Sequence, residues 1–289
     1  MTVDRETLAW AAQILGSRAA TVRKGLREGG SPWLIEADGR KAVLRTGQPS
    51  QQEWFENEAA ALRLAATGGD VPVAEVYATG RKGKTPLMLL EYLEGSSRIP
   101  REPDAARLRA LGAVAARIHA IPPIPGMPER KSPISETDFA QLHREQGSTP
   151  LLDEAEAAIA GARPREEPVF VHGDLWQGNT LWNDGRLTAV IDWDMSGAGP
   201  AGVDLGSLRI DAAFTFGPGG EDEILSGYEE VAGHAANVAY WDVVAGFATP
   251  ADMGWFPEAI GDQGRPDLDR LILTQRRDQF LRDALTRLG

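Results

Sequence analysis

Hydrophobic and polar positions in the first part of the chain follow the pattern of a small antiparallel sheet. Short strand-like runs are separated by turn residues: Glu28-Gly29-Gly30-Ser31-Pro32 divides the first two, and Asp38-Gly39 is a hairpin signal before the third. Helical spacing of apolar residues interrupts this pattern once, over residues 51–66. We therefore predict strands at residues 21–27, 32–37, 41–46, 73–79 and 86–92, and helices at residues 4–15 and 51–66.

The pattern changes after residue 93, where helical spacing becomes dominant. One predicted helix, residues 104–120, is followed by a proline-rich loop that cannot be helical. Further helices are predicted at residues 135–146 and 150–161, a short β region at 168–191, and helices to the C-terminus with breaks at 217–220 and 257–266. We therefore predict an α+β protein with a small sheet lobe, residues 1–93, and a larger, mainly helical lobe, residues 94–289. A cleft between two such lobes is a common ligand site.

The composition narrows the classes of partner. The chain of 289 residues has a formal net charge of −12 and a sequence pI of about 4.9, so neither nucleic acid nor an anionic membrane is expected as its main partner. The same acidity is compatible with a cationic substrate, and also with general solubility. The absence of cysteine excludes disulfides and thiolate chemistry. Because the first residues are charged and no apolar run approaches about 20 residues, we expect a cytoplasmic protein without a membrane span.

Two acidic motifs lie in the predicted β region of the larger lobe. The first is Val171-His172-Gly173-Asp174-Leu175-Trp176-Gln177-Gly178-Asn179, and the second is Ala189-Val190-Ile191-Asp192-Trp193-Asp194. A hairpin predicted at Asn183-Asp184-Gly185 brings the two together. Phosphoryl transfer to a hydroxyl needs one carboxylate that accepts the hydroxyl proton, and a second carboxylate with an amide oxygen that holds magnesium against the phosphates. The motifs therefore indicate phosphoryl transfer.

The order His-Gly-Asp-Leu-x-x-x-Asn and then Ile-Asp-Trp-Asp resembles the aminoglycoside phosphotransferase family, which is related to choline and fructosamine kinases and shares the protein-kinase-like fold. The resemblance implies that Asp174 is the catalytic base and that Asn179 and Asp192 hold Mg²⁺. It also implies ATP or GTP as the phosphoryl donor and a small-molecule hydroxyl as the acceptor. Asp194 departs from the protein-kinase pattern. We expect it to form a salt bridge, and contact with a second metal or with a substrate amine is the alternative.

The predicted helix at residues 51–66 carries a carboxylate on an otherwise apolar stripe. That stripe consists of Trp54, Glu58, Ala61, Leu62 and Ala65. A carboxylate in this position needs a cation, and the nearby strand points Lys41, Val43 and Arg45 to one side. In the family, a lysine of this strand binds the nucleotide phosphates and pairs with a helix glutamate, so the resemblance assigns these roles to Arg45 and Glu58. Lys41 would take the place of Arg45 if the register differed by four residues, and a purely structural ion pair is the other alternative.

Two further segments enter the nucleotide site through the resemblance alone. Gly29-Gly30-Ser31 resembles the loop that covers the nucleotide, where backbone N–H groups can cradle phosphates. Glu91 and Leu93 lie where the lobes join, and backbone groups there are expected to bind adenine.

Two other signals are interpreted as structural. Residues 197–202 satisfy the spacing GxGxxG, but no βαβ unit follows, so we do not expect a dinucleotide site. In the resemblance, Asp204 braces the catalytic loop by accepting backbone hydrogen bonds. The acidic residues at 221–223, 229–230 and 242 are expected to form solvated helix faces rather than the lining of a pocket for a cationic substrate.

The sequence thus predicts a kinase that phosphorylates a hydroxyl of a small molecule such as an aminoglycoside or amino sugar, as a monomer or a homodimer. An amino alcohol, a ketoamine sugar or a macrolide is an alternative acceptor. A second alternative is a non-catalytic, nucleotide-binding pseudokinase that acts through a protein partner. Arg45 is its only support, whereas the intact Asp174, Asn179 and Asp192 argue against it.

Overall fold

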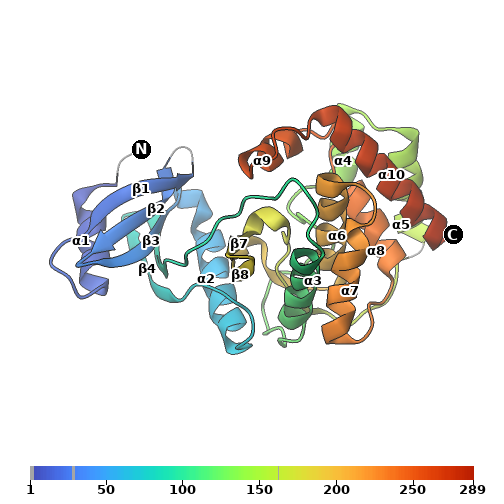
Figure 1. Cartoon of the computed structure of the whole chain (residues 1–289). Coiled ribbons are helices and arrows are strands. Elements are labelled where there is room, and N and C mark those ends of the chain that lie inside the picture. Colours follow the sequence, from blue (N-terminus) through green and yellow to red (C-terminus); the bar gives the residue numbers. More distant parts are fainter. Residues whose placement is uncertain (1–2, 28–29, 162) are drawn as a thin grey trace.

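The computed structural model describes residues 3–27, 30–161 and 163–289, and a sheet-rich part is followed in it by a helical part (Figure 1). The sheet-rich part contains α1 (Arg5–Ile14), β1 (Thr21–Arg27), β2 (Gly30–Ala37), β3 (Arg40–Thr46), α2 (Gln52–Thr67), β4 (Val76–Lys82) and β5 (Thr85–Glu91). Its strands form one antiparallel sheet in the order β1-β2-β3-β5-β4. The predicted sheet that carries one long helix is therefore confirmed.

The two faces of this sheet are covered by different helices. Ala42 and Leu44 of β3 pack with α1, whereas Met88 and Leu90 of β5 pack with α2. This division follows from the alternation of side chains along a strand. Between β2 and β3, the predicted hairpin forms at Asp38-Gly39, where both residues have positive φ.

One predicted position on α2 is wrong. Trp54 was expected on the apolar stripe, but its side chain is 43% exposed, and the neighbouring Phe55 is buried instead. Both residues are large and aromatic, so the sequence pattern alone does not distinguish them. The packing of α2 against β5 determines which of the two is buried, because the helix face that contains Phe55, Glu58 and Leu62 is the one turned toward β5.

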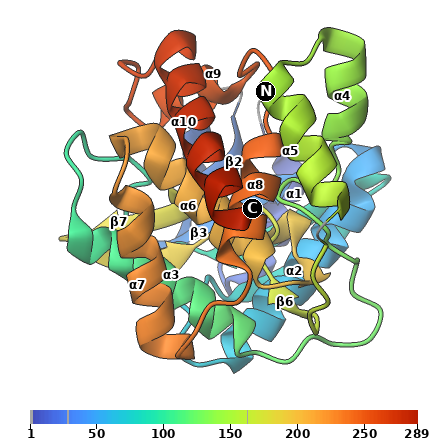
Figure 2. The same ribbon diagram turned by 90° about the vertical axis from the view of Figure 1, so that its right-hand side faces the viewer.

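The helical part contains two small β-ribbons among its helices. Its helices are α3 (Ala105–His119), α4 (Phe139–Gln146), α5 (Pro150–Gly161), α6 (Gly202–Phe216), α7 (Gly220–Ala232), α8 (Val238–Phe247), α9 (Phe256–Asp262) and α10 (Arg270–Leu288). Its strands are β6 (Val169–Val171), β7 (Thr180–Asn183), β8 (Arg186–Val190) and β9 (Gly197–Gly199), and they pair as β6 with β9 and β7 with β8. Helix α8 lies against α5, α6 and α10 (Figure 2).

Two features of this part differ from the prediction. The helix expected at residues 135–146 begins only at Phe139, because the side chain of Asp138 accepts the backbone N–H of Gln141 and caps it there. Strand β9 was not predicted, because its Gly-Ala-Gly sequence has no strand propensity and it forms only through pairing with β6. Antiparallel pairing of these strands also excludes the βαβ unit of a dinucleotide site.

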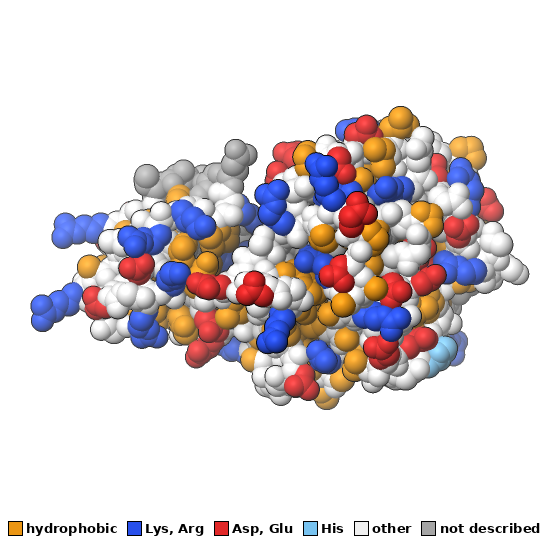
Figure 3. All heavy atoms as spheres, viewed as in Figure 1, with side chains coloured by type: hydrophobic (Ala, Val, Ile, Leu, Met, Phe, Trp, Pro, Cys, Tyr) orange, Lys and Arg blue, Asp and Glu red, His pale blue; other side chains and the backbone are white. Residues whose placement is uncertain are grey.

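A single core cluster reaches from the sheet-rich part into the helical part. It joins Leu62 of α2 and Met88 of β5 to Leu111 of α3, Val190 of β8 and Trp193. Strand β5 ends at Glu91 and α3 begins at Ala105, so the predicted division near residue 93 falls in the connection between them. Figure 3 shows that acidic and basic side chains are interspersed over one face of the molecule. Within the described ranges, no helix combines the length and apolar content needed to cross a bilayer.

Candidate active site

The loop His172–Asn179 connects β6 to β7, and Asp204 of α6 accepts hydrogen bonds from its backbone. The backbone N–H groups of His172 and Gly173 each donate to an Asp204 carboxylate oxygen over 2.8 Å. This is the bracing contact that the resemblance implied for Asp204. Gly173 has a φ of +86°, and a Cβ atom at this position would lie 2.1 Å from the carbonyl oxygen of Met195, so the loop requires glycine here.

Asp204 is in turn supported by a buried side chain that the sequence reading did not identify. His119 Nε2 lies 3.0 Å from Asp204 Oδ2, and His119 Nδ1 lies 3.1 Å from the Tyr228 hydroxyl. Burial alone would raise the pKa of Asp204, but hydrogen bonds from His119 and from the loop backbone outweigh it and lower that pKa. Helices α3, α6 and α7 therefore jointly fix the loop that carries Asp174.

Asp174 and Asn179 face each other within this loop. Asn179 Nδ2 donates to the backbone oxygen of Asp174 over 2.9 Å and to its Oδ2 over 3.0 Å. Burial, together with the nearby Asp192, raises the pKa of Asp174 to about 7. A carboxylate that titrates near neutrality and is held by one amide is suited to accept a proton.

Asp192 lies two positions after Val190, the last residue of β8, and has left-handed backbone angles (φ 66°, ψ 58°). Such a conformation is unusual for a residue with a side chain and is often found at functional sites. Asp192 Oδ2 lies 2.7 Å from Arg27 Nη2, and Asp192 Oδ1 lies 3.5 Å from Arg45 Nη1. Burial would raise the pKa of Asp192, but these two guanidinium groups outweigh it and lower that pKa.

Asp194, two residues further on, does not form the expected salt bridge with any cation of the described residues. Burial and the charge of Asp192 raise the pKa of its carboxyl to about 6. The negative charges of Asp192 and Glu136 act on Asp194, and the positive charges of Arg45 and Arg27 compensate them only in part.

Arg45 links the sheet to α2 and to Asp192. Its Nη1 contacts Glu58 Oε1, and the Glu58 side chain is 2% exposed. Burial raises the pKa of Glu58 to about 8, although Arg45 acts against this shift. Lys41, the alternative to Arg45, lies elsewhere: its Nζ is 3.3 Å from Glu94 Oε1 and stands over the Tyr92 ring. The register of β3 therefore selects Arg45 as the partner of Glu58.

Asn57, next to Glu58 on α2, attaches this helix to the segment that carries Asp192. Its Nδ2 lies 2.7 Å from the carbonyl oxygen of Asp194 and 3.0 Å from that of Ser196. No sequence signal indicates this contact, because a partly exposed asparagine on a helix is usually solvated.

The predicted nucleotide-covering loop is described in part. Gly29 lies outside the described residues. Gly30 begins β2 and is paired with Arg27, and the Ser31 hydroxyl donates to the carbonyl oxygen of Thr46 over 3.1 Å. The role of Gly30 and Ser31 at the nucleotide stays a prediction.

Glu91 and Leu93 lie at the end of β5 and just beyond it, at the connection between the two parts. The backbone N–H of Glu91 donates to the carbonyl oxygen of Glu75 over 2.9 Å. The adenine contact of both residues stays a prediction.

The oxygen donors of this site fit a magnesium ion. Both hydrogen bonds of the Asn179 amide to Asp174 use Nδ2, so Oδ1 points to no hydrogen-bond donor of the described residues. The raised pKa values of Asp174 and Asp194 reflect crowded negative charge that a cation would relieve. No cluster of three or more His, Cys, Asp or Glu side chains in the described ranges is arranged to hold a metal by itself. Magnesium is commonly bound by one or two carboxylates together with phosphates and water.

The acidic residues of α7 and α8 take no part in this site. Arg109 Nε lies 2.6 Å from Glu223 Oε2 at the surface. Asp242 was expected on a solvated face, but it is fully buried and bound by Arg209 and Arg287. A cation on α6 and another on α10 converge on it, which a reading of α8 alone could not reveal.

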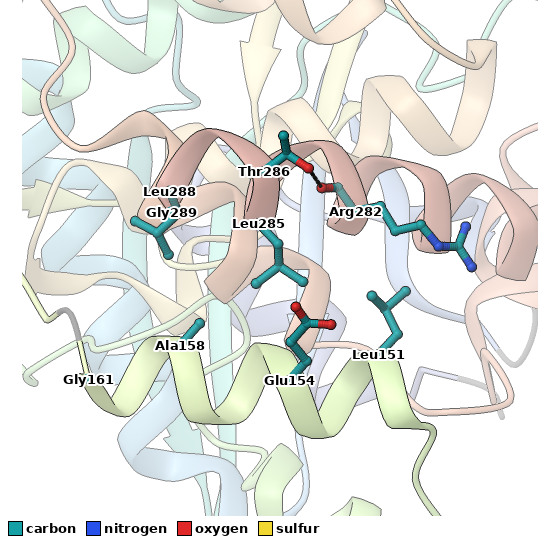
Figure 4. A pocket seen from close by; sticks show the side chains of 9 residues that line it. All are labelled: Leu151, Glu154, Ala158, Gly161, Arg282, Leu285, Thr286, Leu288 and Gly289. Carbon is teal, nitrogen blue, oxygen red and sulfur yellow. Dashed lines mark hydrogen bonds between the residues drawn. The ribbon is translucent and has the colours of Figure 1, made fainter.

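A groove of about 660 Å³ lies between α5 and α10, near the C-terminus. Figure 4 shows Leu151, Glu154 and Leu285 along it. It lies at the opposite end of the molecule from the sheet (Figure 1), and none of the candidate residues lines it. It is therefore separate from the candidate active site.

Comparisons with known proteins point in the same direction as the geometry. The model of a family described as "Phosphotransferase enzyme family" matches residues 22–247. Among solved structures, the macrolide 2'-phosphotransferase MphH from Brachybacterium faecium is 21% identical, with a TM-score of 0.63 over 93% of this chain and 97% of its own. A microcompartment-associated aminopropanol kinase is 18% identical, with a TM-score of 0.66 over 97% and 99%. An aminoglycoside phosphotransferase APH(4)-Ia mutant, in a ternary complex with ADP and hygromycin B, is 16% identical, with a TM-score of 0.62 over 97% and 98%.

Proposed function

The chain belongs to the phosphotransferase enzyme family, and from this premise we propose that it transfers the terminal phosphoryl group of a magnesium-bound nucleoside triphosphate to a hydroxyl of a small molecule. The observation that carries the proposal is the convergence of Asp174, Asn179 and Asp192 with Arg45 and Glu58 between the sheet and the helical part. ATP or GTP is the proposed donor, bound beside Gly30 and Ser31 at the start of β2 and along the end of β5.

Each of these side chains has a proposed part in the reaction. Asp174 orients the acceptor hydroxyl and takes its proton, for which a pKa of about 7 is suitable. Asn179 and Asp192 would hold Mg²⁺, which when bound neutralises charge on the phosphates. Arg45 contacts a phosphate while Glu58 orients its guanidinium, and Asn57 keeps α2 against the Asp192 segment.

The acceptor is proposed to be a hydroxylated amine, sugar or macrolide. Support for this range comes from the relatives, whose names include a macrolide phosphotransferase, an aminopropanol kinase and a complex with hygromycin B. The net charge of −12 and the crowded carboxylates favour a cationic acceptor within it. No observation on the site favours the pseudokinase alternative.

A panel assay tests the proposal. Nucleoside diphosphate release from ATP and GTP is measured with Mg²⁺ against hydroxylated amines, sugars and macrolides, and phosphorylated products are identified by mass spectrometry. The control is Asp174→Asn, which should lower turnover by ~10²–10⁴ because the proton acceptor is lost, while nucleotide affinity stays within about three-fold. If Asp174→Asn turns over substrate at the wild-type rate, Asp174 is not the base. If no acceptor is phosphorylated although the chain binds nucleotide, the result favours the pseudokinase alternative.

A further inference from the structure

Arg27, at the end of the edge strand β1, reaches across to the segment that carries Asp192. Its Nη2 lies 2.7 Å from Asp192 Oδ2, although 165 positions separate the two residues, and the Arg27 side chain is 60% exposed. The pairing of β1 with β2 shifts register between Gly25 and Arg27. Such a bulge re-aims the side chain that follows it, and here Arg27 is directed at the candidate active site.

Together with Arg45, this contact occupies both carboxylate oxygens of Asp192. Arg45 Nη1 is 3.5 Å from Oδ1 and is also held by the buried Glu58, so it is anchored from two sides. Arg27 makes no second ion pair with the described residues. If a cation takes an oxygen of Asp192, Arg27 is therefore the group that leaves.

We propose that Arg27 is a phosphate-binding residue that rests on Asp192 until a metal–nucleotide complex takes over this carboxylate. The inference rests on the proposed function in one respect, namely that Asp192 is the metal ligand. The displaced guanidinium stays close to the bound phosphates, because its strand already brings it within hydrogen-bonding distance of Asp192. Arginine binds phosphate oxygens through two parallel hydrogen bonds, so a phosphate is a better partner for it than one carboxylate oxygen.

The exchange is energetically accessible. The side chain of Arg27 is 60% exposed, whereas that of Asp192 is 20% exposed and keeps Arg45 as a second cation. Arg27 can therefore leave for water at little cost. The cost of breaking this pair therefore opposes nucleotide binding only weakly. In the free protein, the intact pair holds the end of β1 next to Asp192.

The test measures the affinity for a metal ion alone and the affinity for a metal–nucleotide complex. The proposal predicts that replacement of Arg27 changes these two affinities in opposite directions. Binding of Mn²⁺ alone, followed by the electron paramagnetic resonance of the free ion, should become about two- to five-fold tighter in Arg27→Gln, because the ion no longer competes with a guanidinium. Binding of AMP-PNP with Mg²⁺, followed by calorimetry, should become about tenfold weaker, because a charge-assisted contact to phosphate is lost. Arg27→Lys should lie between the wild type and Arg27→Gln in both measurements.

The matched control is Arg23→Gln, on the same strand. Arg23 is similarly exposed and pairs with Glu36 over 3.1 Å, away from the site, so both affinities should stay at the wild-type values. If Arg27→Gln leaves nucleotide affinity unchanged, or weakens both affinities together, the proposal is wrong, and the residue is incidental or merely structural. If the wild type binds nucleotide with no dependence on Mg²⁺, the metal role of Asp192 fails and this inference fails with it.

Discussion

Carboxyl groups in the candidate active site have pKa values that diverge because their neighbours differ. Burial and the charge of Asp192 raise the pKa of Asp174 to about 7 and that of Asp194 to about 6. For Asp192, Arg27 and Arg45 outweigh burial and lower the pKa. Divergent pKa values of this kind separate roles: Asp192 stays ionised and is suited to a cation, whereas Asp174 changes protonation near neutrality and is suited to accept a proton.

The pH dependence of the reaction should report Asp174. Only its ionised form accepts a proton, so kcat/KM for the nucleotide should rise with pH through a limb near pH 7. Burial raises the pKa of Asp174 most, and the charges of Asp192, Asp194 and Asp204 add to this shift, while the hydrogen bond from Asn179 lowers the pKa. Asp194→Asn removes one of the negative charges, so its acid limb should move to lower pH. Rate profiles of the two proteins measure this shift.

Glu136→Gln is the control for this shift. Glu136 acts on the pKa of Asp194 but is not among the groups that act on Asp174. Its removal should leave the acid limb nearly in place. An acid limb that does not move in Asp194→Asn would mean that a group other than Asp174 controls the rate.

At the level of secondary-structure elements, α2 is fixed to the Asp192 segment by Asn57. The amide of this residue donates to the carbonyl oxygens of Asp194 and Ser196, and Glu58 follows it directly in the helix. The position of Glu58 and Arg45 relative to Asp192 therefore depends on a contact between two elements that are far apart in the sequence.

Replacement of Asn57 should weaken nucleotide binding, and this loss should exceed what the lower stability of the variant alone would cause. Asn57→Ala removes the side-chain donor from the carbonyl oxygen of Asp194, whereas that of Ser196 still accepts from Arg130. The loss costs about 1–3 kcal/mol of unfolding free energy if the Asp194 carbonyl stays dry. It also releases α2, so the rise in melting temperature that nucleotide and Mg²⁺ produce should shrink. Glu53→Ala, on an exposed position of the same helix, should change neither quantity. If Asn57→Ala lowers the melting temperature but keeps the full nucleotide-induced rise, Asn57 is only structural.

The sequence predicted the elements and motifs that depend on local signals. The hairpin at Asn183-Asp184-Gly185 forms because Asp184 and Gly185 adopt the positive φ values that such a turn requires. The family resemblance and the α+β fold are confirmed, and the bracing contact of Asp204 is present in the structure. The roles of Asp174, Asn179 and Asp192 stay predictions.

Other features could not be predicted, because they depend on contacts across the chain. Asn57, Arg27 and His119 acquire their importance from partners more than 80 positions away, and each residue type is common at sites without function. The exposure of Trp54 and the pairing of β9 are also decided by tertiary contacts rather than by the local pattern. No period or spacing in a single sequence carries this information.

At the scale of the whole molecule, the hydrophobic core crosses the proposed boundary at residue 93. One cluster contains Leu62 of α2 together with Leu111 of α3, whereas a second cluster, with Leu15 and Ile35, lies entirely before the boundary. The division into residues 1–93 and 94–289 is therefore proposed to separate two functional lobes and not two independent folding units.

Hydrogen exchange in two matched variants can test whether the lobes unfold together. Leu62→Ala and Leu15→Ala each remove a buried leucine, 3% and 5% exposed respectively, and each should lower the free energy of unfolding by about 2–5 kcal/mol. Because Leu62 belongs to the shared cluster, its loss should speed amide exchange in α3 as well as in α2. Leu15 belongs to the cluster formed by α1 and the sheet, so its loss should speed exchange in α1 and the sheet while α3 stays protected. If exchange in α3 is unchanged in Leu62→Ala, the helical part folds without the sheet, and residue 93 marks a boundary between folding units as well as between lobes.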